Sequence, residues 1–141
     1  MNKRQARVRR ARKTRARIAE QRATLDALTG PGVKVINAAA AGVRQPYARM
    51  FWDQPANKWT FVAYNLPANA PGRTYQLWLI TKDQKKVSAG TFAAAPDGKA
   101  FVRATYPLAS DSLVAIAVTD EPAGGSKQPS TTPFLVGAAG K

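Results

Sequence analysis

The sequence contains no cysteine and no histidine among its 141 residues. Disulfides, thiolate nucleophiles and cysteine-ligated metals are therefore excluded, together with the commonest metal ligand and general base. Carboxylates are scarce, since eight Asp and Glu stand against 22 Lys and Arg, for a formal net charge of +14. No apolar run approaches the roughly 18 to 20 residues that cross a bilayer, and no signal peptide follows the basic start. We therefore expect the chain as written to be soluble and cytoplasmic.

The positive charge is concentrated at the start of the chain. Residues 1–22 hold ten Lys and Arg and a single carboxylate, Glu20. Such a block can bind a polyanion such as RNA, and the candidate phosphate-binding residues are Arg4, Arg7, Arg9, Arg10, Arg12, Lys13, Arg15 and Arg17. Alternatively the block is a solvated tail. Attachment to an anionic membrane is a weaker third alternative, because the basic part offers only alanine and one valine as apolar contacts.

Local preferences divide the chain near residue 30. Good helix formers fill the stretch from Lys3 to Leu28, and Gly30 and Pro31 then provide an end signal. This pattern predicts one basic α-helix at the N-terminus. We therefore expect an arm and lead-in over residues 1–30 and a folded domain over residues 31–141.

After Pro31 the sequence changes to short runs rich in Val, Ile, Phe, Tyr, Trp and Thr, separated by turn residues. This texture predicts an all-β fold, an antiparallel β-sandwich of about eight strands. The expected strands run from Val33 to Ala38, Tyr47 to Asp53, Lys58 to Asn65, Thr74 to Thr81, Lys86 to Ala93, Ala100 to Tyr106, Leu113 to Thr119 and Phe134 to Val136.

Few of the remaining side chains are placed for catalysis. Four carboxylates fall at expected strand ends or turns, where Asp commonly caps backbone amides; they are Asp53, Asp83, Asp97 and Asp111. Asp120 and Glu121 are adjacent, so on a strand they would point to opposite faces and could not share acid–base work. We therefore expect no enzyme activity, no catalytic or metal-binding residues and no cofactor.

Large aromatic residues admit two interpretations, a stacking platform for bases or sugars and a hydrophobic core. The residues concerned are Phe51, Trp52, Trp59, Phe61, Tyr75 and Trp78. Their alternation within strands and the lack of interleaved basic residues other than Lys58 favour the core.

One resemblance covers most of the chain. Residues 48–92, from ARMFWDQP to SAGTF, are followed by AVTDEPAGGSKQP and FLVGAAG, and together they closely resemble the C-terminal domain of RskA-type anti-sigma factors over about residues 18–140. The resemblance implies a β-sandwich outside the cytoplasmic membrane, tethered through one transmembrane helix to a cytoplasmic domain that holds a sigma factor inactive. It implies a non-enzymatic sensor or regulatory role with a protein partner of the anti-sigma pathway, and it identifies no partner-binding residues.

A second resemblance is confined to residues 1–20. The stretch MNKRQARVRRARKTRARIAE resembles the N-terminal arm of the eighteenth bacterial large-subunit ribosomal protein, which binds 5S rRNA. It implies an alternative function, RNA binding through the arm, and suggests a chimera, a mispredicted start or an engineered sequence. The chain shows neither a membrane span nor the zinc-binding pattern of anti-sigma domains, so we expect it to be the sensor half alone.

Overall fold

The computed structural model describes residues 32–40 and 45–139, which form eight strands and contain no helix. The strands are β1 (Val33–Ala39), β2 (Tyr47–Asp53), β3 (Lys58–Tyr64), β4 (Arg73–Thr81), β5 (Lys86–Phe92), β6 (Ala100–Thr105), β7 (Leu113–Pro122) and β8 (Leu135–Ala138). The predicted all-β fold is confirmed, and every strand begins within one residue of its predicted start. The predicted N-terminal helix lies outside the described residues.

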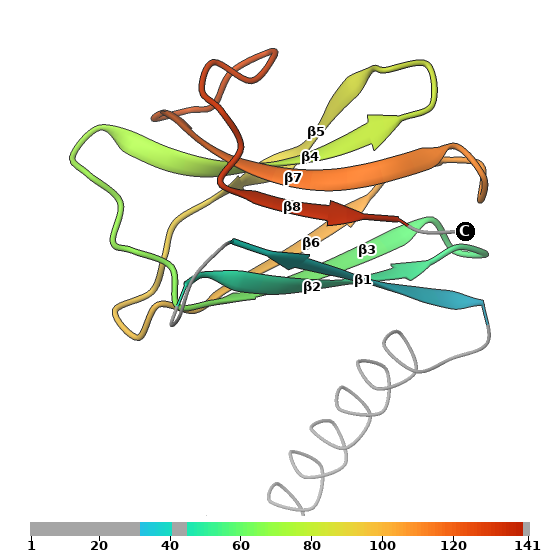
Figure 1. Cartoon of the computed structure of the whole chain (residues 1–141), viewed down its shortest axis with the longest axis horizontal. Coiled ribbons are helices and arrows are strands. Elements are labelled where there is room, and N and C mark those ends of the chain that lie inside the picture. The colour runs from blue at the N-terminus through green and yellow to red at the C-terminus, as the bar shows by residue number, and fades with distance from the viewer. Residues whose placement is uncertain (1–31, 41–44, 140–141) are drawn as a thin grey trace, which may run out of the picture.

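All strand pairs are antiparallel, in the order β5-β4-β7-β8-β1-β2-β3-β6. Figure 1 shows that this sheet folds over on itself, so that β5, β4, β7 and β8 form an upper layer above β1, β2, β3 and β6, the lower layer. At one edge the layers are joined by a single pair, Ala39 with Val136. The two faces of a sandwich are therefore present, but they belong to one nearly closed sheet.

The hydrophobic core lies between the layers. Trp52 and Trp59, which are opposite each other on β2 and β3, stack with ring centroids 4.3 Å apart. They are buried together with Phe61 and Tyr75, so the core interpretation is confirmed for these four aromatic residues. Alternating side chains from every strand complete the core, because successive residues of a strand point to opposite faces.

The other two aromatic residues, Phe51 and Trp78, lie on the outer sides of their layers, and the core interpretation is wrong for Phe51. Phe51 precedes the inward-pointing Trp52, so it points away from the core and is only partly buried. Trp78 is fully buried but lies between Leu77 and Leu79, which are two of the β4 residues that enter the core. Its side chain lies on the outer side of the upper layer, where its indole N–H donates to Thr119 of β7.

Candidate partner-binding surfaces

The predicted phosphate-binding residues of the arm lie outside the described part of the chain. They are Arg4, Arg7, Arg9, Arg10, Arg12, Lys13, Arg15 and Arg17. RNA binding by these residues therefore stays a prediction that the structure does not test.

The carboxylates of the described residues do not gather into a chemical site. Within residues 32–40 and 45–139, no group of three His, Cys, Asp or Glu could hold a metal ion. Asp53 accepts a hydrogen bond from the amide of Ala56 at 3.4 Å, and Asp97 accepts one from the amide of Lys99 at 3.1 Å. These two residues are turn-capping groups, as their positions predicted.

A loop covers the outer side of the upper layer. This β7–β8 loop, residues 123–134, is drawn in red above the layer in Figure 1. Gln76 points outward from β4 and holds the loop through two bonds: its Oε1 accepts from the amide of Ser126 at 2.8 Å, and its Nε2 donates to the carbonyl of Ser126 at 3.0 Å. Nε2 also donates to Oγ of Ser88 on β5 at 2.8 Å. The side chain therefore ties two strands and the loop together.

Glu121 is the second attachment point of the loop, and its side chain is completely buried. Its carboxylate accepts hydrogen bonds from Oγ of Ser126 at 2.7 Å and from the amide of Ser130 at 3.1 Å, and the hydroxyl of Ser130 donates as well. Four donors around one carboxylate compensate for the loss of water, since a buried charge without partners is very costly. The fourth donor is the hydroxyl of Thr119.

The protonation state of Glu121 follows from these contacts. Burial acts to raise the pKa of its carboxyl, but the hydrogen bonds from Ser130, Thr119 and Ser126 outweigh that effect and lower the pKa from 4.5 to about 2. Hydrogen bonds donated to the ionised form favour that form. Glu121 is therefore a charged structural anchor at neutral pH, and the pair of adjacent carboxylates, Asp120 and Glu121, does not form an acid–base site.

We call the region between the upper layer and the β7–β8 loop the covered site. Besides Gln76 and Glu121, two residues contribute to it through close contacts, Trp78 and Gly125. Trp78 donates from Nε1 to Oγ1 of Thr119 at 2.8 Å, which joins the indole to the Glu121 network. At Gly125 the backbone has φ +83, and a Cβ there would lie 2.8 Å from Cγ2 of Thr91 and 3.1 Å from Oε1 of Gln76. Only glycine fits this approach without displacement, because it lacks a Cβ and adopts positive φ freely.

A pocket of about 400 Å³ lies at the end of the layers where Pro67 and Asn69 follow β3. Tyr75 donates its hydroxyl to the carbonyl of Pro67 at 2.6 Å, and burial, with the charge of Asp120, raises the pKa of the phenol. Asp120 itself pairs with Nε of Arg73 at 3.0 Å. Among the described residues nothing bonds to Nδ2 of Asn69. The hydrogen bond from Tyr75 of β4 to Pro67 therefore holds the β3–β4 connection against the upper layer.

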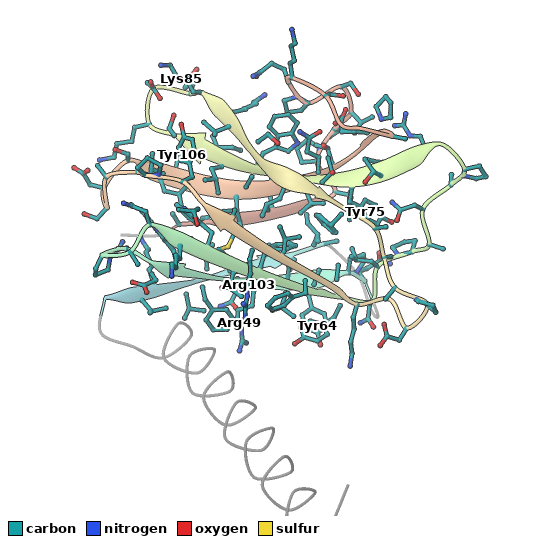
Figure 2. All side chains as sticks on the ribbon, turned by 180° about the vertical axis from the view of Figure 1, so that it is seen from behind. Arg49, Tyr64, Tyr75, Lys85, Arg103 and Tyr106 are labelled. Carbon is teal, nitrogen blue, oxygen red and sulfur yellow. The ribbon has the colours of Figure 1, made fainter. Side chains whose placement is uncertain are left out.

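The outer side of the lower layer has a different character. We define its aromatic–arginine face as Tyr47, Arg49, Phe51, Tyr64, Phe101 and Arg103, which share one side of β2, β3 and β6. Tyr47 is 48% exposed and Phe101 is 53% exposed. Figure 2 shows the labelled side chains Arg49, Tyr64 and Arg103 on the side of this layer that points away from the upper layer.

Contacts within the aromatic–arginine face fix its side chains. Tyr47 and Tyr64 are directly opposite each other, and their rings stack with centroids 4.8 Å apart and planes inclined by 19°. The guanidinium of Arg103 lies 5.1 Å from the ring centroid of Phe101, a cation–π contact. Sequence reasoning missed this face, although the alternation of each strand already placed these residues on the side opposite the core.

Comparisons with known proteins agree with the first resemblance. The family described as "Anti-sigma-K factor rskA, C-terminal" matches residues 3–134. Anti-sigma-K factor RskA of Mycolicibacterium vanbaalenii is 36% identical over 89 residues, which are 62% of this chain and 35% of the relative. The chain thus spans about a third of the length of this curated relative.

Strands β1 to β7 lie within the matched residues 3–134, and β8 follows directly after them. No solved structure matches the chain. The described part of the chain also contains no helix that could serve as a membrane span. Because the family match extends over nearly the whole sequence, the chain belongs to the family of anti-sigma-K factor RskA C-terminal domains.

Proposed function

We propose that this chain is the regulatory domain of an anti-sigma factor and that it works by binding a protein partner, without catalysis. The observation that carries the proposal is the family match over residues 3–134. The sequence lacks His and Cys, and its described carboxylates at positions 53, 97 and 121 accept hydrogen bonds within turns or under the β7–β8 loop. These features suit a rigid binding domain whose function depends on its surfaces.

The proposal includes a place in a larger system. By analogy with the family, the domain lies on the outer side of the cytoplasmic membrane and is linked to a separate part that binds the sigma factor. The chain spans about a third of the M. vanbaalenii relative, and in this proposal sigma binding is assigned to a part that the match does not cover. The division into an arm, residues 1–30, and a domain, residues 31–141, stays a prediction, because the family match includes most of both.

A domain-replacement experiment tests the proposal. The region of M. vanbaalenii RskA that matches this chain is replaced by the complete chain, and a reporter transcribed by the sigma factor of that relative is measured. We expect the hybrid to repress the reporter at rest and to release it under the conditions that release the native protein. A hybrid with Phe61→Ala is the control, since removal of this fully buried ring should destabilise the domain by about 4 kcal/mol.

The result that would overturn the proposal is a hybrid that is folded and present at the native level, yet behaves like a relative from which the matched region was simply deleted. Protein level and limited proteolysis of the hybrid are measured in the same cells. They separate loss of regulation from loss of the protein.

A further inference from the structure

We propose that the pocket at the end of the layers binds a small uncharged molecule that combines an amide group with an aromatic or other apolar body. This inference goes beyond the proposed function, which concerns a protein partner, and does not depend on it. The volume of about 400 Å³ is at the small end of the roughly 300–1,000 Å³ that ligand pockets occupy, which suits a molecule with a single ring.

The pocket lies where the two layers meet. The lower layer contributes Ala40 and Pro46, next to β1 and β2, and the upper layer contributes Tyr75 and Phe134. Residues 67–70 also line the pocket, and they belong to the β3–β4 connection, which crosses from the lower to the upper layer at this end (Figure 1). Mouths of β-barrels are common places for ligand sites, and this sheet is nearly closed. A ligand in the pocket therefore contacts both layers at once.

The aromatic part of the wall is ordered before any ligand binds. The ring centroid of Tyr75 lies 5.2 Å from that of Phe134 and 5.6 Å from that of Phe92. The hydroxyl of Tyr75 is held by its hydrogen bond to the carbonyl of Pro67. Side chains that are already ordered lose little entropy on binding, so their contacts yield a higher affinity. Together with the alanines and prolines of the wall, these rings favour an apolar body for the ligand.

One polar group of the wall lacks an acceptor. Asn69 lines the pocket, and its Oδ1 accepts a hydrogen bond from the amide of Ala94 at 2.9 Å. Its Nδ2 is buried, and no described residue accepts a hydrogen bond from it. A buried donor without a partner is costly, so its presence in a folded domain requires an explanation. The carbonyl oxygen of a ligand, reached by a small rotation of the side chain, supplies the missing acceptor.

A second polar group of the wall supplies an acceptor. Asp120 lines the pocket, and its Oδ1 is engaged by Nε of Arg73 at 3.0 Å. No donor within residues 32–40 and 45–139 bonds to its other carboxylate oxygen, and the side chain is 49% exposed. An N–H group of a ligand can therefore donate to this oxygen.

These two groups select the class of ligand. An amide carries both a carbonyl that accepts from Asn69 and N–H groups that donate to Asp120. An anionic ligand is disfavoured, because the residues that line the pocket include a carboxylate and no Lys or Arg. An ammonium offers no acceptor to Asn69, and Arg73 already balances the charge of Asp120. An uncharged amide therefore fits the pocket better than either ion.

The experiment is a titration of the complete, isotope-labelled chain, followed by NMR through its backbone amide signals. Three ligands share one ring and differ in their polar group: benzamide, benzoate and benzylamine. Benzamide is also titrated against Asn69→Asp, which keeps an acceptor for the amide of Ala94 but removes the Nδ2 donor. The matched control is Asn57→Asp, since Oδ1 of Asn57 likewise accepts a hydrogen bond from a backbone amide, that of Leu108, but at the other end of β3.

Circular dichroism verifies that each variant is folded. If Asn69→Asp unfolds, Ala68→Phe replaces it, because this exposed wall position narrows the pocket without removing a hydrogen-bonding side chain.

We expect benzamide to shift the amide signals of Asn69, Tyr75 and Phe134 saturably, with a dissociation constant of about 1–10 mM for a ligand with so few atoms. Its affinity should fall at least about fivefold in Asn69→Asp and change less than about twofold in Asn57→Asp. Benzoate and benzylamine should bind at least about tenfold more weakly than benzamide.

The proposal is overturned if benzamide does not shift these signals, if the Asn69 and Asn57 variants lose affinity equally, or if either ion binds as tightly as benzamide. Because binding is measured directly on the chain, these outcomes do not depend on transcriptional regulation, which the domain-replacement experiment tests separately.

Discussion

The two layers of this domain are built from the same number of strands, but their outer sides are finished in opposite ways. On the upper layer, the β7–β8 loop covers Trp78 and attaches to Gln76 and Glu121. On the lower layer, Tyr47 and Phe101 remain about half exposed. The first arrangement contributes to stability within the chain, and the second leaves aromatic side chains in contact with water. Substitutions that are similar in size should therefore have very different consequences on the two sides.

The sharpest contrast pairs Trp78→Ala with Phe101→Ala. Trp78 is fully buried, so we expect its truncation to lower the free energy of unfolding by about 4 kcal/mol. Phe101 is 53% exposed, so its truncation should cost less than about 1 kcal/mol. Urea unfolding followed by far-ultraviolet circular dichroism measures both. Equal losses would show that the face is a structural element of the domain and would remove the distinction between the layers.

Substitution of Glu121, which anchors the β7–β8 loop, should have the next largest effect on the free energy of unfolding. Glu121→Leu leaves the hydroxyls of Ser126 and Ser130 and the amide of Ser130 without their acceptor, and we expect a loss of about 3 kcal/mol in the free energy of unfolding. Glu121→Gln keeps one acceptor oxygen and should lose less. Amide hydrogen exchange provides a local readout, since the amide of Ser130 should become much less protected. Unchanged protection there would contradict the role assigned to the carboxylate.

The glycines of the loop provide a matched pair with a smaller effect. Both have positive φ, +91 for Gly124 and +83 for Gly125, but a Cβ at Gly124 meets nothing within 4 Å. Gly124→Ala should therefore report backbone strain alone, about 1 kcal/mol, whereas Gly125→Ala adds a clash with Thr91 and Gln76 and should cost about 2 kcal/mol. Thermal unfolding of the two variants tests the difference. If Gly124→Ala is the more damaging, the close approach at Gly125 is not what fixes the loop.

The strands could be predicted from the sequence because their signals are local. Alternation with a period of two and turn residues such as Asn57 and Gly98, both with positive φ, mark where each strand begins and ends. The same alternation shows why the prediction that Phe51 belongs to the core was wrong. Neighbouring residues on a strand face opposite sides, so Phe51 and Trp52 could not both enter one core. The prediction treated aromatic residues as a class and did not apply the alternation to each of them.

The covered site could not be predicted in the same way because its contacts join distant parts of the chain. Gln76 stands among apolar residues of β4, and its partner Ser126 lies 50 residues later in the sequence. The burial of Glu121 depends on the path of the β7–β8 loop, which no local preference specifies. A polar residue within an apolar strand is nevertheless a usable signal, because a buried polar group requires partners. Gln76 therefore indicated that something covers this side, without indicating what.

Near neutral pH, the smallest expected effect is the pH dependence of the Glu121 anchor. The pKa of Glu121 is lowered from 4.5 to about 2 in the folded domain, so the unfolded chain binds more protons between these values and stability rises with pH there. The contribution of Glu121 should be complete above pH 4.5, hence constant around neutrality, and should be lost as the pH falls towards 2. The difference in unfolding free energy between the native chain and Glu121→Gln isolates this contribution from that of other carboxylates. A difference that varies between pH 6 and pH 8, well above the 4.5 of an unperturbed glutamate, would mean that Glu121 is not held as a carboxylate by its four donors.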